Sequence, residues 1–231
     1  MKNNINTKLC IICIKSNSSG IKNKNFKLIN GKPLFSYTIE QAKSSKIFDK
    51  IIVSTDSYKA LKMIKKYNVD YIFIRPKNIS FAKTDKLKVI RNALKVAENY
   101  FNLRFSYIFD LDVTSPLRKI SDIKNSFREF KKKESDNLFT VCKSKKNPSF
   151  NIVEFYKNEI KLVKKSSKNI VARQNAPKVY DMNASIYIWK RAALLRKNLF
   201  NKKTSVYVMP PERSIDIDDF FDLKLVKLLI K

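Results

Sequence analysis

Residues 8–33, KLCIICIKSNSSGIKNKNFKLINGKP, hold both glycines of the chain, Gly20 and Gly31. Their first part, residues 9–14, is a short apolar run rich in β-branched side chains, which predicts a buried strand. Residues 15–25 then combine lysines and serines with one glycine. A strand that leads into such a loop is how α/β proteins cradle phosphates, because backbone N–H groups turn inward and ammonium groups neutralise the anion. An ordinary lysine-rich surface loop is the alternative interpretation.

Strand-like and helix-like segments alternate from this loop to residue 142. The apolar spacing predicts helices at 33–45, 60–67, 84–101 and 123–130, and strands at 50–55, 69–74, 105–109 and 137–142. Such alternation predicts an α/β fold in which a mixed, mostly parallel sheet carries helices on both faces.

The alternation breaks over residues 143–183, which contain short strand-like pieces at 152–156 and 159–163 and little helix. We expect a small antiparallel arm there. Strands at 184–189 and 205–209 and helices at 191–197 and 219–230 then resume the main pattern. The length of 231 residues suits one domain, so we predict a single domain over residues 1–231 with 143–183 inserted as an arm.

The chain is strongly basic. Lysine and arginine number 49 against 20 acidic residues, which gives a formal net charge of +29. Such an excess suits nucleic-acid binding. Only nine of these residues are arginines, however, and the lysines are spread over nearly every segment, whereas base-reading contacts favour arginine. We therefore expect no nucleic-acid partner, although the charge would attract anionic nucleotides.

The residue types that are present or missing exclude several kinds of catalytic and metal site. The chain has no histidine, which excludes serine–histidine and cysteine–histidine nucleophiles and imidazole metal sites. Cys10 and Cys13 have redox spacing but lie inside an apolar strand run, so with Cys142 they indicate core packing in a reducing compartment. No apolar run is long enough to span a membrane, and the first residues lack a signal-peptide pattern. We expect a cytoplasmic protein without a membrane partner.

Two pairs of aspartates follow predicted strands. Asp110 and Asp112 alternate along an extended segment and therefore point the same way, and Asp216 and Asp218 repeat the pattern. Paired carboxylates together with substrate phosphates suit Mg²⁺. The alternative for the first pair is that Asp110 caps the turn before Thr114, and for the second that Asp218 or Asp219 is the N-cap of the last helix.

A set of motifs resembles the CMP-sialic acid synthetase (acylneuraminate cytidylyltransferase) family along nearly the whole chain. The segments that carry the resemblance are Ile14-Lys-Ser-Asn-Ser-Ser-Gly-Ile-Lys-Asn-Lys-Asn25, Gly31-Lys-Pro-Leu34, Ile52-Val-Ser-Thr-Asp-Ser57, Arg75-Pro76, Thr114-Ser-Pro-Leu-Arg118, Arg173-Gln174, Asn183-Ala-Ser-Ile-Tyr187 and Ser214-Ile-Asp-Ile-Asp218. The resemblance implies a three-layer, Rossmann-like fold of the nucleotide-diphosphosugar-transferase type. It also implies transfer of CMP from CTP to a nonulosonic (sialic-type) acid, with release of pyrophosphate, for surface glycan synthesis.

The resemblance also implies roles for individual residues. The implied catalytic residues are Lys15, Ser18, Lys24, Asp216 and Asp218. The implied nucleotide-binding residues are Lys15, Asn17, Ser18, Gly20, Lys24, Asn25 and Arg75. The implied sugar-binding residues are Asp112, Thr114, Ser115, Arg173, Gln174 and Asn183. Asp216 and Asp218 would hold Mg²⁺, and the arm would join a homodimer in which Arg173 and Gln174 reach the partner's sugar.

The motifs also depart from the family pattern. The family's loop arginine is Lys15 here and its loop lysine is Ser19, for which Lys22 or Lys24 would compensate. The aspartate that usually follows Arg-Pro aligns with Ala82. The glutamine that faces the sugar in the family is Asp112, and we expect this carboxylate to join the metal because it would repel an acidic sugar.

Three alternatives remain open. An eight-carbon keto sugar acid cytidylyltransferase would share the fold, although the Ser-Ile-Asp-Ile-Asp segment argues against it. Ser19 and Ala82 leave room for a catalytically impaired homologue that still binds nucleotide. A basic nucleic-acid-binding protein is the third.

Overall fold

A seven-stranded sheet forms the centre of the chain, and β2 (Lys8–Ile14) lies inside it between β5 (Lys50–Thr55) and β8 (Tyr107–Leu111). The computed structural model describes residues 2–3, 6–16, 20–80, 85–165, 170–196 and 198–230. The strand order is β13-β9-β12-β8-β2-β5-β6, completed by β6 (Tyr71–Ile74), β9 (Asn137–Lys143), β12 (Tyr180–Lys190) and β13 (Thr204–Val208). β12 runs antiparallel to both of its neighbours, and the other pairs are parallel. The predicted mixed, mostly parallel sheet is confirmed.

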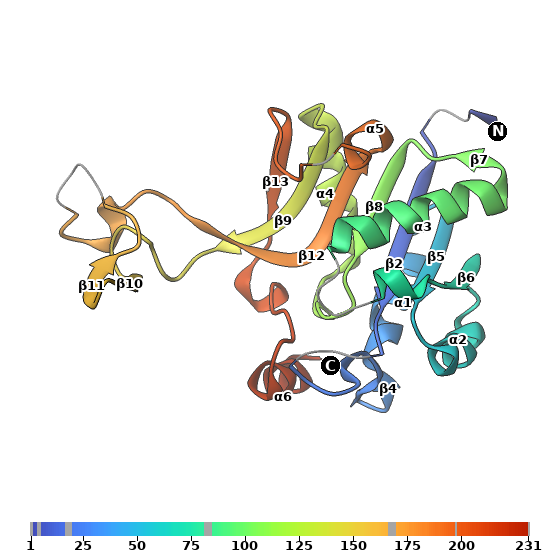
Figure 1. Ribbon diagram of the computed structural model, residues 1–231, viewed down its shortest axis with the longest axis horizontal. Coiled ribbons are helices and arrows are strands. Elements are labelled where there is room, and N and C mark those ends of the chain that lie inside the picture. Colours follow the sequence, from blue (N-terminus) through green and yellow to red (C-terminus); the bar gives the residue numbers. More distant parts are fainter. Residues whose placement is uncertain are drawn as a thin grey trace.

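Helices cover both faces of this sheet. The cluster on one face includes side chains of α1 (Leu34–Ser45), α2 (Tyr58–Ile64), α4 (Ile120–Lys132) and α6 (Phe220–Leu229). The other face is covered by α3 (Lys86–Phe101), which crosses the front of the sheet in Figure 1, and by α5 (Arg191–Leu194). Burial of both faces explains why the interior strands are continuous apolar runs.

The alternation of β2 shows how the two clusters are divided. Cys10, Ile12 and Ile14 pack into the first cluster, whereas Leu9 and Ile11 pack into the second. Side chains on a strand point alternately to its two faces, so one apolar run supplies both cores. Cys10 is a free, buried thiol, which agrees with the core-packing interpretation.

Several element boundaries differ from the sequence predictions. The Asp85 carboxylate caps α3 by accepting from the Leu87 N–H at 2.9 Å, so this helix begins at Lys86. The fourth strand lies at Tyr107–Leu111 instead of 105–109, which places Asp110 within it. Asp219 caps α6 in a capping box, and this confirms the alternative role offered for that residue.

The shorter elements complete the chain. Two small sheets pair β1 (Lys2–Asn3) with β7 (Leu103–Arg104) and β3 (Leu28–Ile29) with β4 (Lys32–Pro33). Single 3₁₀ turns lie at Lys24–Phe26, Lys65–Tyr67, Lys77–Ile79, Arg173–Asn175 and Pro211–Arg213. Within the described ranges, no helix has the length and apolar character needed to cross a bilayer.

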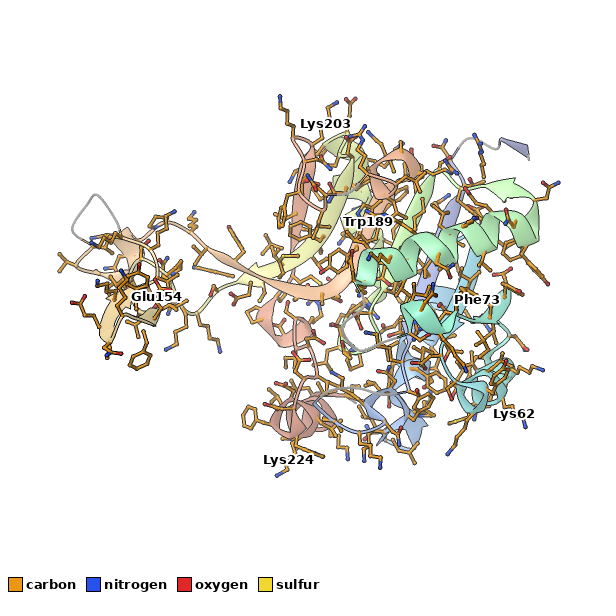
Figure 2. The ribbon with its side chains drawn as sticks, in the orientation of Figure 1. Lys62, Phe73, Glu154, Trp189, Lys203 and Lys224 are labelled. Atoms are coloured by element: carbon orange, nitrogen blue, oxygen red, sulfur yellow. The ribbon has the colours of Figure 1, made fainter. Side chains whose placement is uncertain are left out.

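An arm extends from the body at the ends of β9 and β12 (Figure 1). It carries an antiparallel hairpin of β10 (Val153–Tyr156) and β11 (Glu159–Leu162), where Figure 2 places Glu154 far from the sheet. Every residue of both strands is exposed. The small antiparallel sheet is therefore confirmed, and its role in dimerisation stays a prediction.

Candidate active site

The loop after β2 is held at the carboxyl end of the sheet. The Asn25 side-chain amide donates to the Lys15 carbonyl at 3.0 Å, which closes the loop across its base. The Ser16 N–H donates to Asp56 Oδ1 at 2.8 Å. Asn17 and Ser18, both predicted to bind nucleotide, lie outside the described residues, as do Ser19 and Ala82.

Gly20 fits closely against the segment that contains the second aspartate pair. A Cβ atom at this position would lie 2.1 Å from the Asp218 carbonyl oxygen, so only glycine allows the two segments to approach in this way. The Lys24 ammonium donates to the Ile217 carbonyl and pairs with Asp218 Oδ1 at 3.2 Å. Residues from opposite ends of the chain therefore meet at one place.

Arg75 is buried beside the same loop. Its Nη2 donates to the Ile14 carbonyl at 2.7 Å and lies 3.6 Å from Asp56 Oδ2. Its Nε and Nη1 atoms, and the Oδ1 atom of Asn25, are buried without a hydrogen-bond partner among the described residues. Such atoms carry a cost that a bound polar ligand would remove. The structure thus brings together the predicted nucleotide-binding residues Lys15, Gly20, Lys24, Asn25 and Arg75.

A lysine that the sequence did not single out connects the first aspartate pair. Lys86, the first residue of α3, lies 2.7 Å from Asp110 Oδ2 and 2.5 Å from Asp112 Oδ2. The two aspartates therefore do point the same way, as their spacing predicts. Lys86 is one of forty lysines, and nothing in its local sequence distinguishes it.

The three groups of this cluster influence one another. Burial raises the pKa of Asp110, although Lys86 opposes the shift. Burial would also raise the pKa of Asp112, but Lys86 and the hydrogen bonds from Thr114 hold it well below its usual range. Thr114 donates to Asp112 Oδ1 from its N–H at 3.1 Å and from its hydroxyl at 3.0 Å. Asp112 is therefore ionised and already supplied with donors on both oxygens.

Asp216 differs from Asp112 because its pKa is raised. Burial, aided by the negative charge of Asp112, raises its pKa to about 6. Its Oδ1 atom is buried and has no hydrogen-bond partner within the described part of the chain. A carboxylate in this state gains from a bound cation, so its chemistry fits the predicted Mg²⁺. No three acidic or thiol groups among the described residues form a ready metal site, and the set of Asp112, Asp216 and Asp218 as ligands stays a prediction.

Arg118 holds the surrounding strand ends in place. It is buried and donates from Nε to Gln41 Oε1 at 3.0 Å, and from Nη2 to Thr38 Oγ1 and the Asp112 carbonyl, both at 2.8 Å. Its Nη1 donates to the Ser185 carbonyl. This guanidinium joins α1, β12 and the turn after β8.

Two of the predicted sugar-binding residues form hydrogen bonds with other residues of the chain. Ser115 donates its hydroxyl to the Asn183 carbonyl at 3.3 Å. The Asn183 amide accepts from the Thr140 hydroxyl at 2.6 Å and donates to Ser214 Oγ at 2.9 Å. Both side chains are buried, so they position the segments around them. A direct contact with a sugar stays a prediction for both.

Arg173 and Gln174 lie apart from these groups, at the base of the arm. They line a hollow of about 580 Å³ together with Lys143, Lys146, Lys178 and Pro211, among others. Both residues are exposed, and Arg173 donates to the Ser144 carbonyl at 3.1 Å. The basic lining suits an anionic ligand.

The family model described as cytidylyltransferase matches residues 9–224, which include both aspartate pairs and the loop after β2. The chain belongs to the cytidylyltransferase family. This confirms the family inferred from the motifs, and with it the assignment as a nucleotidyltransferase.

Relatives in Campylobacter extend over nearly the same length. The chain is 41% identical over 224 residues to the post-translational flagellin modification protein B of Campylobacter coli, which covers 96% of this chain and 94% of that protein. It is 42% identical to the CMP-N,N'-diacetyllegionaminic acid synthase of Campylobacter jejuni, over 96% of this chain and 94% of that protein. Identity to a pseudaminic acid cytidylyltransferase of Campylobacter jejuni is 31%, over 96% of each chain.

Solved structures show the same fold at low identity. A CMP:2-keto-3-deoxy-manno-octonic acid synthetase complexed with CTP superposes with a TM-score of 0.69 at 12% identity, over 97% of this chain and 98% of that one. A 4-diphosphocytidyl-2C-methyl-D-erythritol synthase gives 0.70 at 10% identity, over 98% and 99%. These likenesses confirm a nucleotidyltransferase-type α/β fold.

Proposed function

We propose that this cytidylyltransferase transfers CMP from CTP to the anomeric hydroxyl of a nonulosonic acid, for surface glycan synthesis. The relatives named for legionaminic acid, at 42% identity, and for pseudaminic acid, at 31%, support a nonulosonic acid over an eight-carbon sugar acid, because the octonic acid synthetase shares only 12% identity. The observation that carries the proposal is the buried Oδ1 of Asp216, which has no hydrogen-bond partner among the described residues. Asp216 belongs to the segment against which Gly20 of the phosphate-type loop fits.

The reaction exchanges one phosphorus–oxygen bond for another. The sugar hydroxyl oxygen bonds to the α-phosphorus of CTP, the bond from that phosphorus to the bridging oxygen of the β-phosphate breaks, and pyrophosphate leaves. The hydroxyl proton passes to solvent through an aspartate of the site, because the chain has no histidine to act as the base. Charge builds on the phosphate oxygens, so catalysis consists mainly of positioning and of electrostatic stabilisation.

The residues of the site divide these tasks. Lys15 and Lys24, with the backbone of the loop, would balance the charge of the triphosphate. Arg75 and Asn25 would hold the nucleoside through the two donors and the acceptor that are buried without partners in the part of the chain that the structure describes. Asp216 and Asp218 would hold Mg²⁺ together with phosphate oxygens. When bound, the metal would withdraw charge from the α-phosphate.

We also propose that the active form is a homodimer joined through the arm. Large apolar side chains of the hairpin are exposed, with Phe155 at 83% and Ile160 at 64% of their full accessibility. A second copy of the chain would bury them. In that assembly the partner's Arg173 and the partner's Gln174 would approach the acidic sugar.

The proposal is tested by measuring pyrophosphate release from CTP and Mg²⁺ with a panel of nonulosonic acids and one eight-carbon keto sugar acid. Release should depend on a nonulosonic acid and be lost in Asp216→Ala. Asp219→Asn is the matched control, because it removes a neighbouring charge and keeps an N-cap for α6. CTP binding without release for any acid would instead support the catalytically impaired homologue.

A further inference from the structure

The first aspartate pair already has a cation, and the chain itself supplies it. Lys86 Nζ lies 2.7 Å from Asp110 Oδ2, 2.5 Å from Asp112 Oδ2 and 5.2 Å from the centre of the Tyr187 ring. The Asp110 side chain is fully buried, and that of Asp112 is 22% exposed. Two carboxylates that lie together with so little water need a positive partner. The ammonium takes the position of a bridging cation, and none of the roles assigned above uses this lysine.

Both carboxylate oxygens of Asp112 already accept hydrogen bonds. Oδ2 accepts from Lys86, and Oδ1 accepts from the N–H and the hydroxyl of Thr114 at 3.1 Å and 3.0 Å. A metal ion at Asp112 would have to displace these donors, and the neighbouring ammonium would repel it. Asp216 differs, because its buried Oδ1 has no hydrogen-bond partner among the residues that the structure describes. The distribution of donors therefore favours a metal at the second aspartate pair without Asp112.

Contacts from Asp112 lead to the segment that carries the second aspartate pair. The Ile217 N–H donates to the Thr114 carbonyl at 2.9 Å. Ile217 is fully buried and lies between the two aspartates of that pair. The path from the beginning of α3 to the second pair therefore runs through Lys86, Asp112, Thr114 and Ile217. A change at Lys86 would reach the second pair along this path.

We propose that Lys86 is a positioning residue for the reaction, an inference that rests on the proposed function. It balances the charge of the first aspartate pair, keeps Asp112 away from the metal and, through Thr114, fixes the segment of the second pair. Asp216 and Asp218 are then the carboxylates that face Mg²⁺. This assignment differs from the expectation drawn from the sequence, in which Asp112 joins the metal.

A double-variant cycle tests whether Lys86 acts through Asp112. Lys86→Met leaves two carboxylates without their cation, so kcat for pyrophosphate release should fall about 10–100-fold while the KM of CTP changes less than about threefold. Asp112→Asn removes one of these charges, so the kcat of Lys86→Met/Asp112→Asn should be no lower than that of Lys86→Met. Lys86→Arg keeps the charge and should retain kcat within about fivefold. Lys88→Met, on the exposed side of α3, is the matched control and should leave kcat unchanged.

Binding of Mn²⁺ in the presence of CTP, followed by electron paramagnetic resonance with CTP alone as the reference, is a second measurement that needs no turnover. Asp216→Asn should weaken Mn²⁺ binding at least about tenfold more than Asp112→Asn does, because the affinity of such a site depends on the number of charged ligands. Circular dichroism establishes that each variant is folded, and the Mn²⁺ comparison does not depend on Lys86→Met.

Two results would overturn the positioning role. One is an equal loss of Mn²⁺ affinity in Asp112→Asn and Asp216→Asn, which would make Asp112 a ligand. The other is a kcat of the double variant that falls by the product of the two single losses, which would show that Lys86 and Asp112 act independently. If the unsubstituted chain releases no pyrophosphate with any acid, the proposed function fails, and the Mn²⁺ comparison still decides whether Asp112 is a ligand.

Discussion

β9 and β12 pass through two opposite environments. In the body, β9 is buried along Asn137–Val141, and nearby Arg118 satisfies acceptors from three elements. At the other end the same strands lead into an arm whose hairpin is exposed at every residue. The body thus closes its core within one chain, whereas the arm has apolar side chains that no described part of this chain covers. Removal of a body residue should cost folding free energy, and removal of an arm residue should change assembly.

The largest loss of stability should come from Arg118→Ala in the body. This substitution removes the hydrogen bonds that the buried guanidinium donates to Gln41 Oε1, to the Thr38 hydroxyl and to the carbonyls of Asp112 and Ser185. We expect the free energy of unfolding to fall by about 3–5 kcal/mol. Urea denaturation measures the change. Arg128→Ala, on the exposed side of α4, should change it by less than about 0.5 kcal/mol. Equal losses in the two variants would contradict the central position given to Arg118.

The next largest effect should be a loss of catalytic activity, and it should come from Asp216. Its pKa is raised from 3.8 to about 6, so the folded chain takes up this proton more readily than the unfolded chain. Activity that needs the carboxylate should therefore fall as the pH drops through about 6. Asp216→Asn should lower kcat by about 10²–10³-fold.

The free energy of unfolding should depend on pH in the opposite sense to the activity. The ionised Asp216 lowers the free energy of unfolding as the pH rises from 4 towards its folded-state pKa of about 6, and Asp216→Asn removes this penalty. At pH 8 the variant should be about 1–2 kcal/mol more stable than the unsubstituted chain, with the gain absent at pH 4. Chemical denaturation at the two pH values measures this. A loss of stability at pH 8 would show that Asp216 is stabilised by a partner.

Substitutions of the two glycines should have effects of intermediate size, and each substitution serves as the control for the other. Gly20→Ala places a Cβ atom 2.1 Å from the Asp218 carbonyl oxygen and should push the loop away, raising the KM of CTP about tenfold. Gly31 has a φ of +77° and open space around it, so Gly31→Ala should cost about 1 kcal/mol of stability without changing that KM. Titration with CTP and thermal unfolding separate the effects. The reverse pattern would show that the approach of Gly20 to Asp218 does not shape the nucleotide site.

The smallest effect on folding should come from the arm. Phe155→Ser should alter the free energy of unfolding of the body by less than about 0.5 kcal/mol. It should nevertheless lower the mass found by light scattering from twice 27.0 kDa to that of one chain. Tyr58→Ser removes a similarly exposed ring from α2 and should leave the mass unchanged. An unsubstituted chain that scatters as a monomer would remove the dimer from the proposal.

The sequence predicted the elements of the body well, because their signals are local. The apolar run of β2, the spacing along α1 and the strand Lys50–Thr55 depend on residues close together in the chain. Boundaries were less accurate where a cap or a register decides them, as at Lys86 and Tyr107. The acidic pairs were recognisable because acidic residues are scarce in this chain, and the family motifs located the rest of the site.

By itself, then, the sequence determined the layered α/β fold, the family and the stretches that meet at the carboxyl end of the sheet. Only the tertiary structure decided which charges become partners. The contact of Lys86 with Asp110 and Asp112, and that of Gly20 with Asp218, join residues that are far apart in the chain. These contacts depend on the order of the strands and on the placement of α3 across them. A local pattern carries no record of that order, so one lysine among forty acquires its role only when the sheet forms.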